Sequence, residues 1–254
     1  MKNLREFQLN LLEMLKELDK VLKENKLPYF LLGGSALGAV RHKGFIPWDD
    51  DIDIGLWRND FEKMEKILQE KLPKNLLYCK VGKNKIPHAP IGYLYDISNP
   101  DIPLEKVPTI DIFAIDNVPD NKIMEKIQNI FSEVYHLCIY RKPAQNRGKL
   151  AYIFTKYILT IFPNFLLDFL QNLSKKIIIL YKDKETEYVN NIFGMNYEKV
   201  KKEVMKMPIL AKFEDKKFPI PILYDEYLRT LYGDYMKIPK EDKRQPKHKV
   251  DMFN

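Results

Sequence analysis

Four of the five residues from Asp49 to Asp53 are aspartates, and Ile52 is the apolar exception. Carboxylates held this close repel one another, and a divalent cation is the usual partner that relieves the repulsion. On a strand, Asp51 and Asp53 would leave the same face, and Asp50 would point the other way unless the strand begins after it. We therefore predict that Asp51 and Asp53 are metal ligands, with Asp49 and Asp50 in supporting or capping roles.

A further carboxylate, Asp111, stands among the apolar residues Ile110, Ile112, Phe113 and Ile115. A carboxylate without a partner is costly in a core strand. A neighbouring strand that carries Asp51 and Asp53 would place Asp111 beside the same cation. We therefore predict Asp111 as the third ligand, although a solvated acidic turn remains the simpler explanation for any one aspartate pair.

A small-residue turn, Gly33-Gly34-Ser35, precedes the acidic run and leads into a predicted helix over about 35–42. Backbone N–H groups at the start of a helix bind phosphate oxygens. An ordinary turn between a strand and a helix is the alternative, and the position directly before the acidic run favours the phosphate site.

Two larger side chains nearby extend this prediction. Arg41 could meet phosphate charge, and Trp48 could stack on a base or contact a quaternary ammonium through its ring face. Packing of Trp48 in the core is an equally good explanation. The predicted contacts of a phosphate-bearing ligand are Gly33, Gly34, Ser35, Arg41, Trp48 and Asp49.

The elements that position these residues follow from hydrophobic periodicity. Apolar spacing of three and four predicts helices, and short apolar or alternating runs predict strands, with a strand or hairpin near 213–222. We expect helices over about 3–25, 121–140 and 224–232, and another whose buried stripe runs from Phe61 to Leu72. We expect strands over 29–32, 52–56, 76–81, 91–97 and 107–115. Strands concentrate in the first half of the chain, which predicts the α+β class. We expect a catalytic core over 1–140 and a helical C-terminal part over 141–254, packed together.

The composition fits a globular protein with a sizeable core. The chain has 254 residues and a net charge of +7, which suits anionic partners, but its scattered lysines form no DNA-reading motif. Cys79 and Cys138 lack the spacing of a zinc site or a disulfide framework. The start has no signal-peptide core, and no apolar run approaches ~18 residues. We therefore expect a cytoplasmic protein that binds no nucleic acid.

The segment 150–181 is rich in Ile, Leu, Phe and Tyr, is split by Pro163 and carries scattered lysines. Ordinary packed helices are the favoured interpretation. The alternative is peripheral contact with the inner face of the cytoplasmic membrane, with aromatic and aliphatic side chains toward the lipid and lysines at its phosphates.

Residues 34–41 followed by 44–53 are similar to the signature of LicD-type phosphotransferases, relatives of the fukutin group in the nucleotidyltransferase superfamily. Residues 110–116 resemble the third acidic strand of that family. Residues 224–239 resemble its closing Tyr-Gly-Asp motif, with Arg244 and His248 beyond it.

The resemblance implies a nucleotidyltransferase-like mixed sheet with flanking helices. It also implies transfer of a phospho-alcohol, most often phosphocholine from CDP-choline, to a hydroxyl of a surface glycan or its lipid-linked precursor, with Mg²⁺ or Mn²⁺. By motif position, Asp51 and Asp53 are ligands and Asp111 is the third carboxylate. Asp111 is also our candidate to position or deprotonate the attacking hydroxyl.

Several other activities stay open. The donor could carry glycerol or ribitol phosphate, or a nucleotidyltransferase could leave NMP on its acceptor. A metal-dependent glycosyltransferase also uses an Asp-x-Asp motif, but its nucleotide-binding half normally precedes that motif by more residues than this chain has. A nucleotide- or glycan-binding module is the alternative without catalysis, and the presence of all three carboxylates argues against it.

Overall fold

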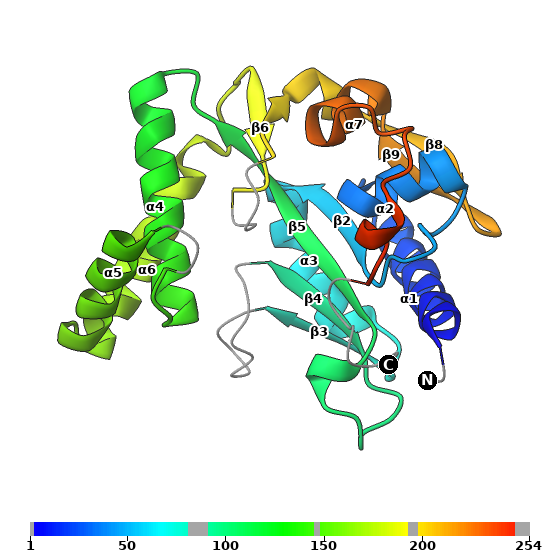
Figure 1. The fold of residues 1–254 in the computed structure, drawn as a ribbon, viewed down its shortest axis with the longest axis horizontal. Helices are drawn as coiled ribbons and strands as arrows, with labels where there is room; N and C mark the ends of the chain where they lie inside the picture. The colour runs from blue at the N-terminus through cyan, green and yellow to red at the C-terminus, as the bar shows by residue number, and fades with distance from the viewer. Residues whose placement is uncertain (1–2, 81–90, 145–147, 193–197, 247–254) are drawn as a thin grey trace. The chain divides into compact units, whose positions relative to one another are not determined.

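The computed structural model describes residues 3–80, 91–144, 148–192 and 198–246 (Figure 1). It divides into two compact units. Unit 1 comprises Met1–Cys79, Gly92–Ile115 and Val200–Asn254, and unit 2 comprises Lys80–Ile91 and Asp116–Lys199. By their contacts, the residues from Val200 onward group with the N-terminal elements.

Unit 1 is built on a mixed sheet with the strand order β1-β2-β5-β4-β3. Strand β1 pairs antiparallel with β2, β2 pairs parallel with β5, and β4 pairs antiparallel with β5. The strands are Phe30–Leu31 (β1), Ile52–Trp57 (β2), Leu76–Lys80 (β3), Gly92–Asp96 (β4) and Thr109–Val118 (β5). Together with the helices, this sheet confirms the predicted α+β class.

The two central strands have one apolar face and one acidic face. Ile52 and Ile54 of β2 and Ile110 and Ile112 of β5 are completely buried. Because side chains alternate along a strand, the residues between these isoleucines face the other side of the sheet. The burial of the isoleucine face therefore fixes the face on which the aspartates lie.

Helices α1 (Leu4–Glu24) and α3 (Arg58–Lys71) bury apolar stripes in unit 1. The α1 helix begins after Asn3, whose side chain accepts a hydrogen bond from the N–H of Glu6. Along α1, residues at spacings of three and four are almost fully buried, as the periodicity predicts. They include Phe7, Leu11, Leu15, Leu18 and Leu22.

Short elements complete unit 1. Helix α2 (Gly33–Leu37) runs directly into a π-helical turn, Gly38–His42. The C-terminal part contributes β7 (Val200–Lys201), the hairpin of β8 (Pro208–Phe213) and β9 (Lys216–Pro221), and α7 (Tyr224–Tyr232). The sequence predicted a strand or hairpin near 213–222, and β9 lies within that range, whereas β8 precedes it apart from Phe213.

Unit 2 contains the end of β5, β6 (Tyr188–Asn190) and the helices α4 (Lys122–Tyr140), α5 (Lys149–Ile161) and α6 (Asn164–Ile178). Strand β6 pairs antiparallel with the end of β5, and α4 packs along α6 (Figure 1). Its core is a small cluster of buried side chains: Val118, Tyr135, Ile178 and Ile192.

Candidate functional site

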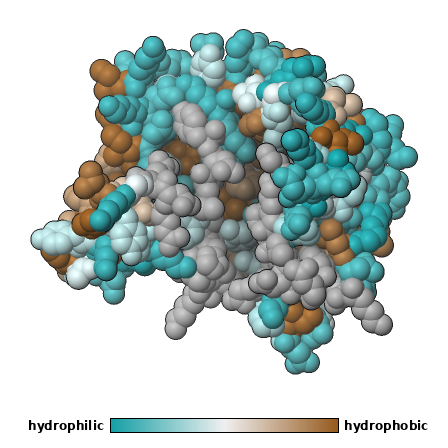
Figure 2. Space-filling model, viewed as in Figure 1, coloured by the Kyte–Doolittle hydropathy of each residue, from teal (hydrophilic) through white to brown (hydrophobic). Residues whose placement is uncertain are grey.

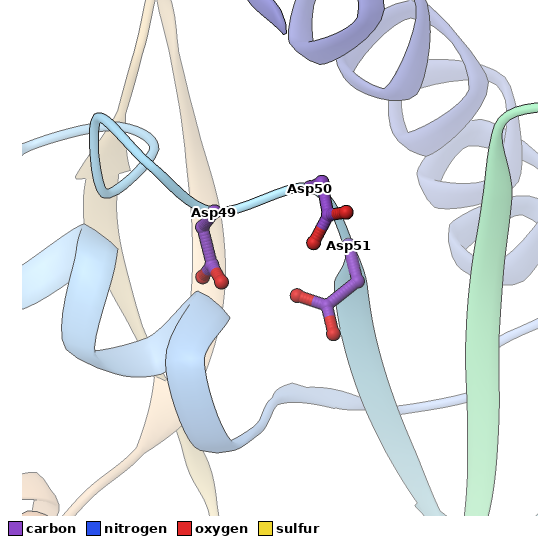
Figure 3. Close-up of side chains that lie close together, drawn as sticks. All are labelled: Asp49, Asp50 and Asp51. Atoms are coloured by element: carbon purple, nitrogen blue, oxygen red, sulfur yellow. The ribbon is translucent and has the colours of Figure 1, made fainter. Parts of the chain in front are cut away.

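Three consecutive aspartates gather at the entry to β2 (Figure 3). One carboxylate oxygen from each of Asp49, Asp50 and Asp51 lies within 4.8 Å of the other two. Asp50 is buried, and the other two are partly exposed. Strand β2 begins at Ile52, so strand alternation does not extend back to Asp50 and does not turn its carboxylate away from its neighbours.

The parallel pairing of β2 with β5 places Asp53 directly opposite Asp111. Residues paired in this way present their side chains on the same face of the sheet. Both aspartates are partly exposed, and the isoleucines on either side of each are buried. The sheet thus sets two further carboxylates side by side, on strands that are far apart in the sequence.

The glycine turn lies directly against these acids. Gly33 has a φ of +50°, and a Cβ added there would lie 3.3 Å from Asp53 Oδ2. A Cβ on Gly34 would lie 2.8 Å from Asp49 Oδ2, closer than side-chain atoms tolerate. Gly33 is therefore favoured by its backbone conformation, and a side chain at Gly34 would displace the Asp49 carboxylate.

The amides at the start of α2 divide into two pairs. Leu32 N–H donates to the carbonyl of Asp53, and Gly33 N–H donates to the hydroxyl of Tyr227, both over 2.9 Å. Helix geometry supplies no intrahelical acceptor for the next two amides, those of Gly34 and Ser35. The predicted phosphate cradle therefore narrows to Gly34 and Ser35, because the Gly33 amide already has an acceptor.

The hydroxyl of Ser35 ties this turn to the acidic strand. Its Oγ accepts a hydrogen bond of 2.9 Å from the N–H of Asp53, and its side chain is buried. The hydroxyl oxygen of Ser35 thus holds Asp53 in place. Because accepting this bond leaves the hydroxyl hydrogen as a donor, the predicted contact between Ser35 and phosphate can use the amide or the hydroxyl.

Arg41 lies at the end of the π-helical turn and reaches the C-terminal segment. Its guanidinium donates to the carbonyl of Tyr235 over 2.6 Å and to that of Lys237 over 3.5 Å. Partial burial lowers the pKa of Arg41, and the nearby Tyr232 and Asp49 oppose that shift. Arg41 therefore sets a positive charge near Asp49 and also anchors the chain that follows α7.

Trp48 is partly buried between two side chains. The His42 ring meets it edge-on, with 6.1 Å between ring centroids, and the Arg244 guanidinium lies over its face at 5.7 Å. The sequence predicted that the ring face of Trp48 could contact a quaternary ammonium. In the structure, the cation over that face is the Arg244 guanidinium. His248 lies outside the described residues.

Gln8 of α1 holds the backbone of the aspartate loop, which sequence reasoning missed. Its Nε2 donates to the carbonyls of Ile46 (3.2 Å) and Asp49 (2.9 Å), and its Oε1 accepts from Arg5. The signal was present in the sequence, because Gln8 is a polar residue within the buried face of an amphipathic helix.

Glu214, in the turn between β8 and β9, supports the same loop from another direction. Its carboxylate accepts two hydrogen bonds from the Arg5 guanidinium and one from the N–H of Phe45. The bonds from Arg5 lower the pKa of Glu214. A Cβ on Gly44 would lie 2.4 Å from Glu214 Oε1, so the two segments pack closely. No local pattern in the sequence reveals this long-range contact.

Helix α7 brings tyrosines to the glycine turn. Tyr227 is buried and accepts the Gly33 amide, whereas Tyr232 is 45% exposed with its hydroxyl 3.5 Å from the position of a Cβ on Gly33. Gly233 ends the helix with a φ of +64°. Tyr235 donates to Asp225, and burial together with that bond raises the pKa of Tyr235 to about 12. The closing motif thus caps a helix and also lines the site.

The donor set suits a hard divalent cation. It offers only carboxylate oxygens at the acidic cluster, several of them partly exposed, and no thiolate or imidazole among them. Mg²⁺ and Mn²⁺ prefer such oxygen ligands. The residues that are present therefore fit the predicted ion class.

Comparison with known proteins agrees with this chemistry. Residues 26–134 match the family described as LicD/FKTN/FKRP, nucleotidyltransferase domain. The lipopolysaccharide cholinephosphotransferase LicD of Haemophilus influenzae is 30% identical over 256 residues, covering 96% of each chain.

The human ribitol 5-phosphate transferase FKRP is 45% identical over 47 residues, 18% of this chain and 10% of that protein. An uncharacterised protein of Rickettsia prowazekii is 40% identical over 62 residues, 24% of this chain and 23% of that protein. The near-complete match to the Haemophilus protein establishes that this chain belongs to the LicD family of phosphotransferases.

Proposed function

We propose that this protein transfers phosphocholine from CDP-choline to a hydroxyl of a cell-surface glycan or of its lipid-linked precursor. The observation that carries the proposal is the pairing of Asp53 with Asp111 beside a glycine turn. This arrangement combines charge-neutralising carboxylates with backbone donors for phosphate. The likeness to the Haemophilus cholinephosphotransferase along nearly the whole chain supports choline as the alcohol.

Asp51, Asp53 and Asp111 would hold Mg²⁺ or Mn²⁺, with Asp49 and Asp50 close to the first of them. When bound, such an ion would neutralise the donor diphosphate and stabilise charge on the departing phosphate. Asp50 is buried and Asp49 and Asp51 are partly exposed, so the cluster is open to solvent at Asp49 and Asp51.

The chain's own groups would orient the donor. The amides of Gly34 and Ser35 would donate to phosphate oxygens at the start of α2. Arg41, held by the carbonyl of Tyr235, would place its positive charge toward the departing CMP. Because Ser35 also binds the Asp53 amide, the phosphate donors and the carboxylates keep a fixed spacing.

In the transfer step, the acceptor hydroxyl oxygen would attack the phosphorus that carries choline. The new oxygen–phosphorus bond forms as the bond from that phosphorus to the bridging oxygen of CMP breaks, so CMP leaves with the bonding electron pair. Asp111 would orient the hydroxyl and accept its proton. Asp111 suits this role because β5 presents it beside Asp53 on the open face of the sheet.

A second phospho-alcohol is the principal alternative. The match to FKRP, a ribitol 5-phosphate transferase, covers 47 residues and supports CDP-ribitol as a donor to be tested. CDP-glycerol belongs to the same chemical class. A nucleotidyltransferase that leaves NMP on the acceptor would use the same carboxylates. It would instead break the bond between the bridging oxygen and the phosphorus attached to the nucleoside.

The experiment is a panel of CDP-choline, CDP-ribitol and CDP-glycerol, each tested for CMP release with Mg²⁺, with Mn²⁺ and with a chelator, with and without a glycan acceptor. We expect CMP release that needs the ion and the acceptor and that is fastest with CDP-choline. A faster reaction with CDP-ribitol would replace the alcohol in the proposal. No release from any donor in the presence of acceptor and ion would contradict it.

A further inference from the structure

Helix α5 presents an apolar stripe to solvent. Leu150, Ile153, Phe154, Tyr157 and Ile161 recur at spacings of three and four, so they share one face of the helix. Leu150 is 85% exposed, Phe154 65%, Tyr157 64% and Ile161 52%. No residue of α5 is buried. The stripe has the periodicity of a core-facing helix, but it does not face a core within the described residues.

The stripe continues onto α6 beyond Pro163. Phe165 is 74% exposed and Phe169 60%, one turn apart on that helix. The buried residues of α6, which include Leu167 and Ile178, lie on its other side. Figure 2 shows hydrophobic atoms gathered at the left of the view, where Figure 1 draws α4, α5 and α6. The two helices thus carry a single aromatic and aliphatic surface around a bend.

Neither helix of this pair has the length and apolar composition to span a membrane by itself. No single helix in the described part of the chain is long and apolar enough to span a membrane, and the two helices are bent by 120° at their break. By length and apolar composition alone, the two helices together could form a broken span. Helices with one apolar face and one polar, lysine-bearing face are typical of those that lie in the plane of a bilayer interface.

Positive charge surrounds the stripe. Residues 141–184 contain nine basic and two acidic side chains, so this stretch alone has an excess of positive charge as large as the +7 of the whole chain. Lys149 and Lys156 lie on α5, Lys175 and Lys176 lie in the last turns of α6, and Lys182 and Lys184 follow. A second copy of the same surface would bring these like charges together, whereas anionic lipid headgroups complement them.

We propose that α5 and α6 form a docking surface for an anionic lipid bilayer, with Phe154, Tyr157 and Phe165 inserted among the acyl chains and the flanking lysines at the phosphates. Aromatic rings suit the boundary between headgroups and acyl chains, and lysines extend their charge from an apolar stem. The contact would bring the enzyme to a membrane surface, and it stands whether or not choline is the transferred alcohol.

Co-sedimentation of the full chain with phosphatidylcholine vesicles, with and without phosphatidylglycerol, tests this surface. We expect binding to the anionic vesicles that weakens as salt is raised and is weak on phosphatidylcholine alone. Phe154→Ser with Phe165→Ser should lower the partition coefficient at least about tenfold. Lys156→Glu with Lys176→Glu should lower the partition coefficient to a similar extent. This second variant changes only lysines, so it tests the surface even if the phenylalanine variant misfolds.

Matched controls come from α4, where Ile123 and Ile130 are also exposed, at 68% and 52%. Ile123→Ser with Ile130→Ser should leave vesicle binding unchanged. The proposal is overturned if the full chain does not bind anionic vesicles, or if the α4 control loses as much binding as the α5–α6 variants. It is also overturned if the phenylalanine variant instead dissociates a dimer that forms without lipid.

Discussion

Helices α1 and α5 carry the same kind of apolar stripe in opposite surroundings. In unit 1, α1 buries Leu11, Leu15 and Leu18 completely, and even its polar Gln8 is inside. In unit 2, α5 has a stripe of the same spacing and buries none of it. Periodicity therefore predicts that a helix has an apolar side, and the tertiary structure decides what that side meets.

The same contrast extends to the polar groups of the two units. In unit 1, three side chains bind the backbone of the segment that carries the aspartates: Gln8 donates to a carbonyl, and Ser35 and Glu214 accept from N–H groups. In unit 2, Gln128 donates to the carbonyl of Ile178 and Asn117 to that of Tyr181, so these polar contacts hold the unit's own elements together. We infer that unit 1 holds the reacting groups in place and that unit 2 offers a surface.

The largest expected effect is on the transfer rate, which should fall for a variant in unit 1 and not for a variant in unit 2. Asp53→Asn should lower the transfer rate by about 1000-fold or more, because it removes a carboxylate from the proposed cation site. Asp168→Asn, an exposed aspartate of α6 paired with Arg141, should change the rate by less than about twofold. Steady-state CMP release measures both. Equal loss in the two variants would contradict the assignment of chemistry to unit 1.

The next effect compares the two stripes directly. Leu15→Ala in α1 should lower the free energy of unfolding by about 2–5 kcal/mol, since it opens a cavity in a packed core. Leu150→Ala in α5 should change it by less than about 0.5 kcal/mol, since that side chain is 85% exposed. Urea denaturation followed by circular dichroism gives both values. A large loss in the α5 variant would mean that its stripe is packed against protein.

A smaller effect tests the support of the aspartate loop. Gln8→Met should leave the carbonyls of Ile46 and Asp49 without their donor and cost about 1–3 kcal/mol of stability. We expect kcat for CMP release to fall about tenfold, since a small displacement of catalytic groups has effects of that order or larger. Gln69→Met, at an exposed position of α3, is the matched control and should alter neither quantity. Unchanged kcat in the Gln8 variant would assign it a structural role alone.

The smallest expected effects concern how two glutamates make the stability of the fold depend on pH, in opposite directions. The bonds from Arg5 lower the pKa of Glu214, so its stabilising contribution is present above the ordinary glutamate pKa and is lost as the pH falls through the folded-state value. Burial raises the pKa of Glu198, in unit 2, to about 7. The folded state then keeps a proton that the unfolded state has lost, and stability falls as the pH rises from the ordinary glutamate value to about 7.

Urea denaturation between pH 2 and pH 8 measures both. Relative to wild type, Glu198→Gln should gain about 1–2 kcal/mol at the alkaline end and little at the acid end. Glu214→Gln should lose stability at neutral pH and converge on wild type in acid. Parallel curves for the wild type and the two variants would show that neither carboxyl has the environment described above.

Much of the sheet and its acidic face could be predicted from sequence, because both depend on local alternation. The isolated Asp111 in an apolar run indicated a strand beside the one that carries Asp53, and the structure pairs these two residues. The class and the helices α1, α4 and α7 follow from periodicity for the same reason. Long-range partners were not predictable: Glu214 reaches Phe45 from 169 residues away.

Other differences come from where elements begin. Gly33 and Gly34 form the first turn of α2 itself, so the Gly33 amide meets Tyr227 and does not face an open cradle. Strand β2 begins at Ile52, which frees Asp50 from the alternation that would have turned it away. Element ends depend on tertiary contacts as well as on propensity, and the chemistry of this site is concentrated at such ends.

The most direct test follows the two halves of the donor separately. CDP-choline labelled either in the cytidine or in the choline is incubated with a glycan acceptor and Mg²⁺, with the wild-type protein and with Asp53→Asn. We predict that choline label moves to the acceptor together with phosphate, that cytidine label leaves as CMP, and that both transfers stop with a chelator or in Asp53→Asn. Cytidine label on the acceptor, or transfer that continues without a divalent cation, would contradict the proposed reaction.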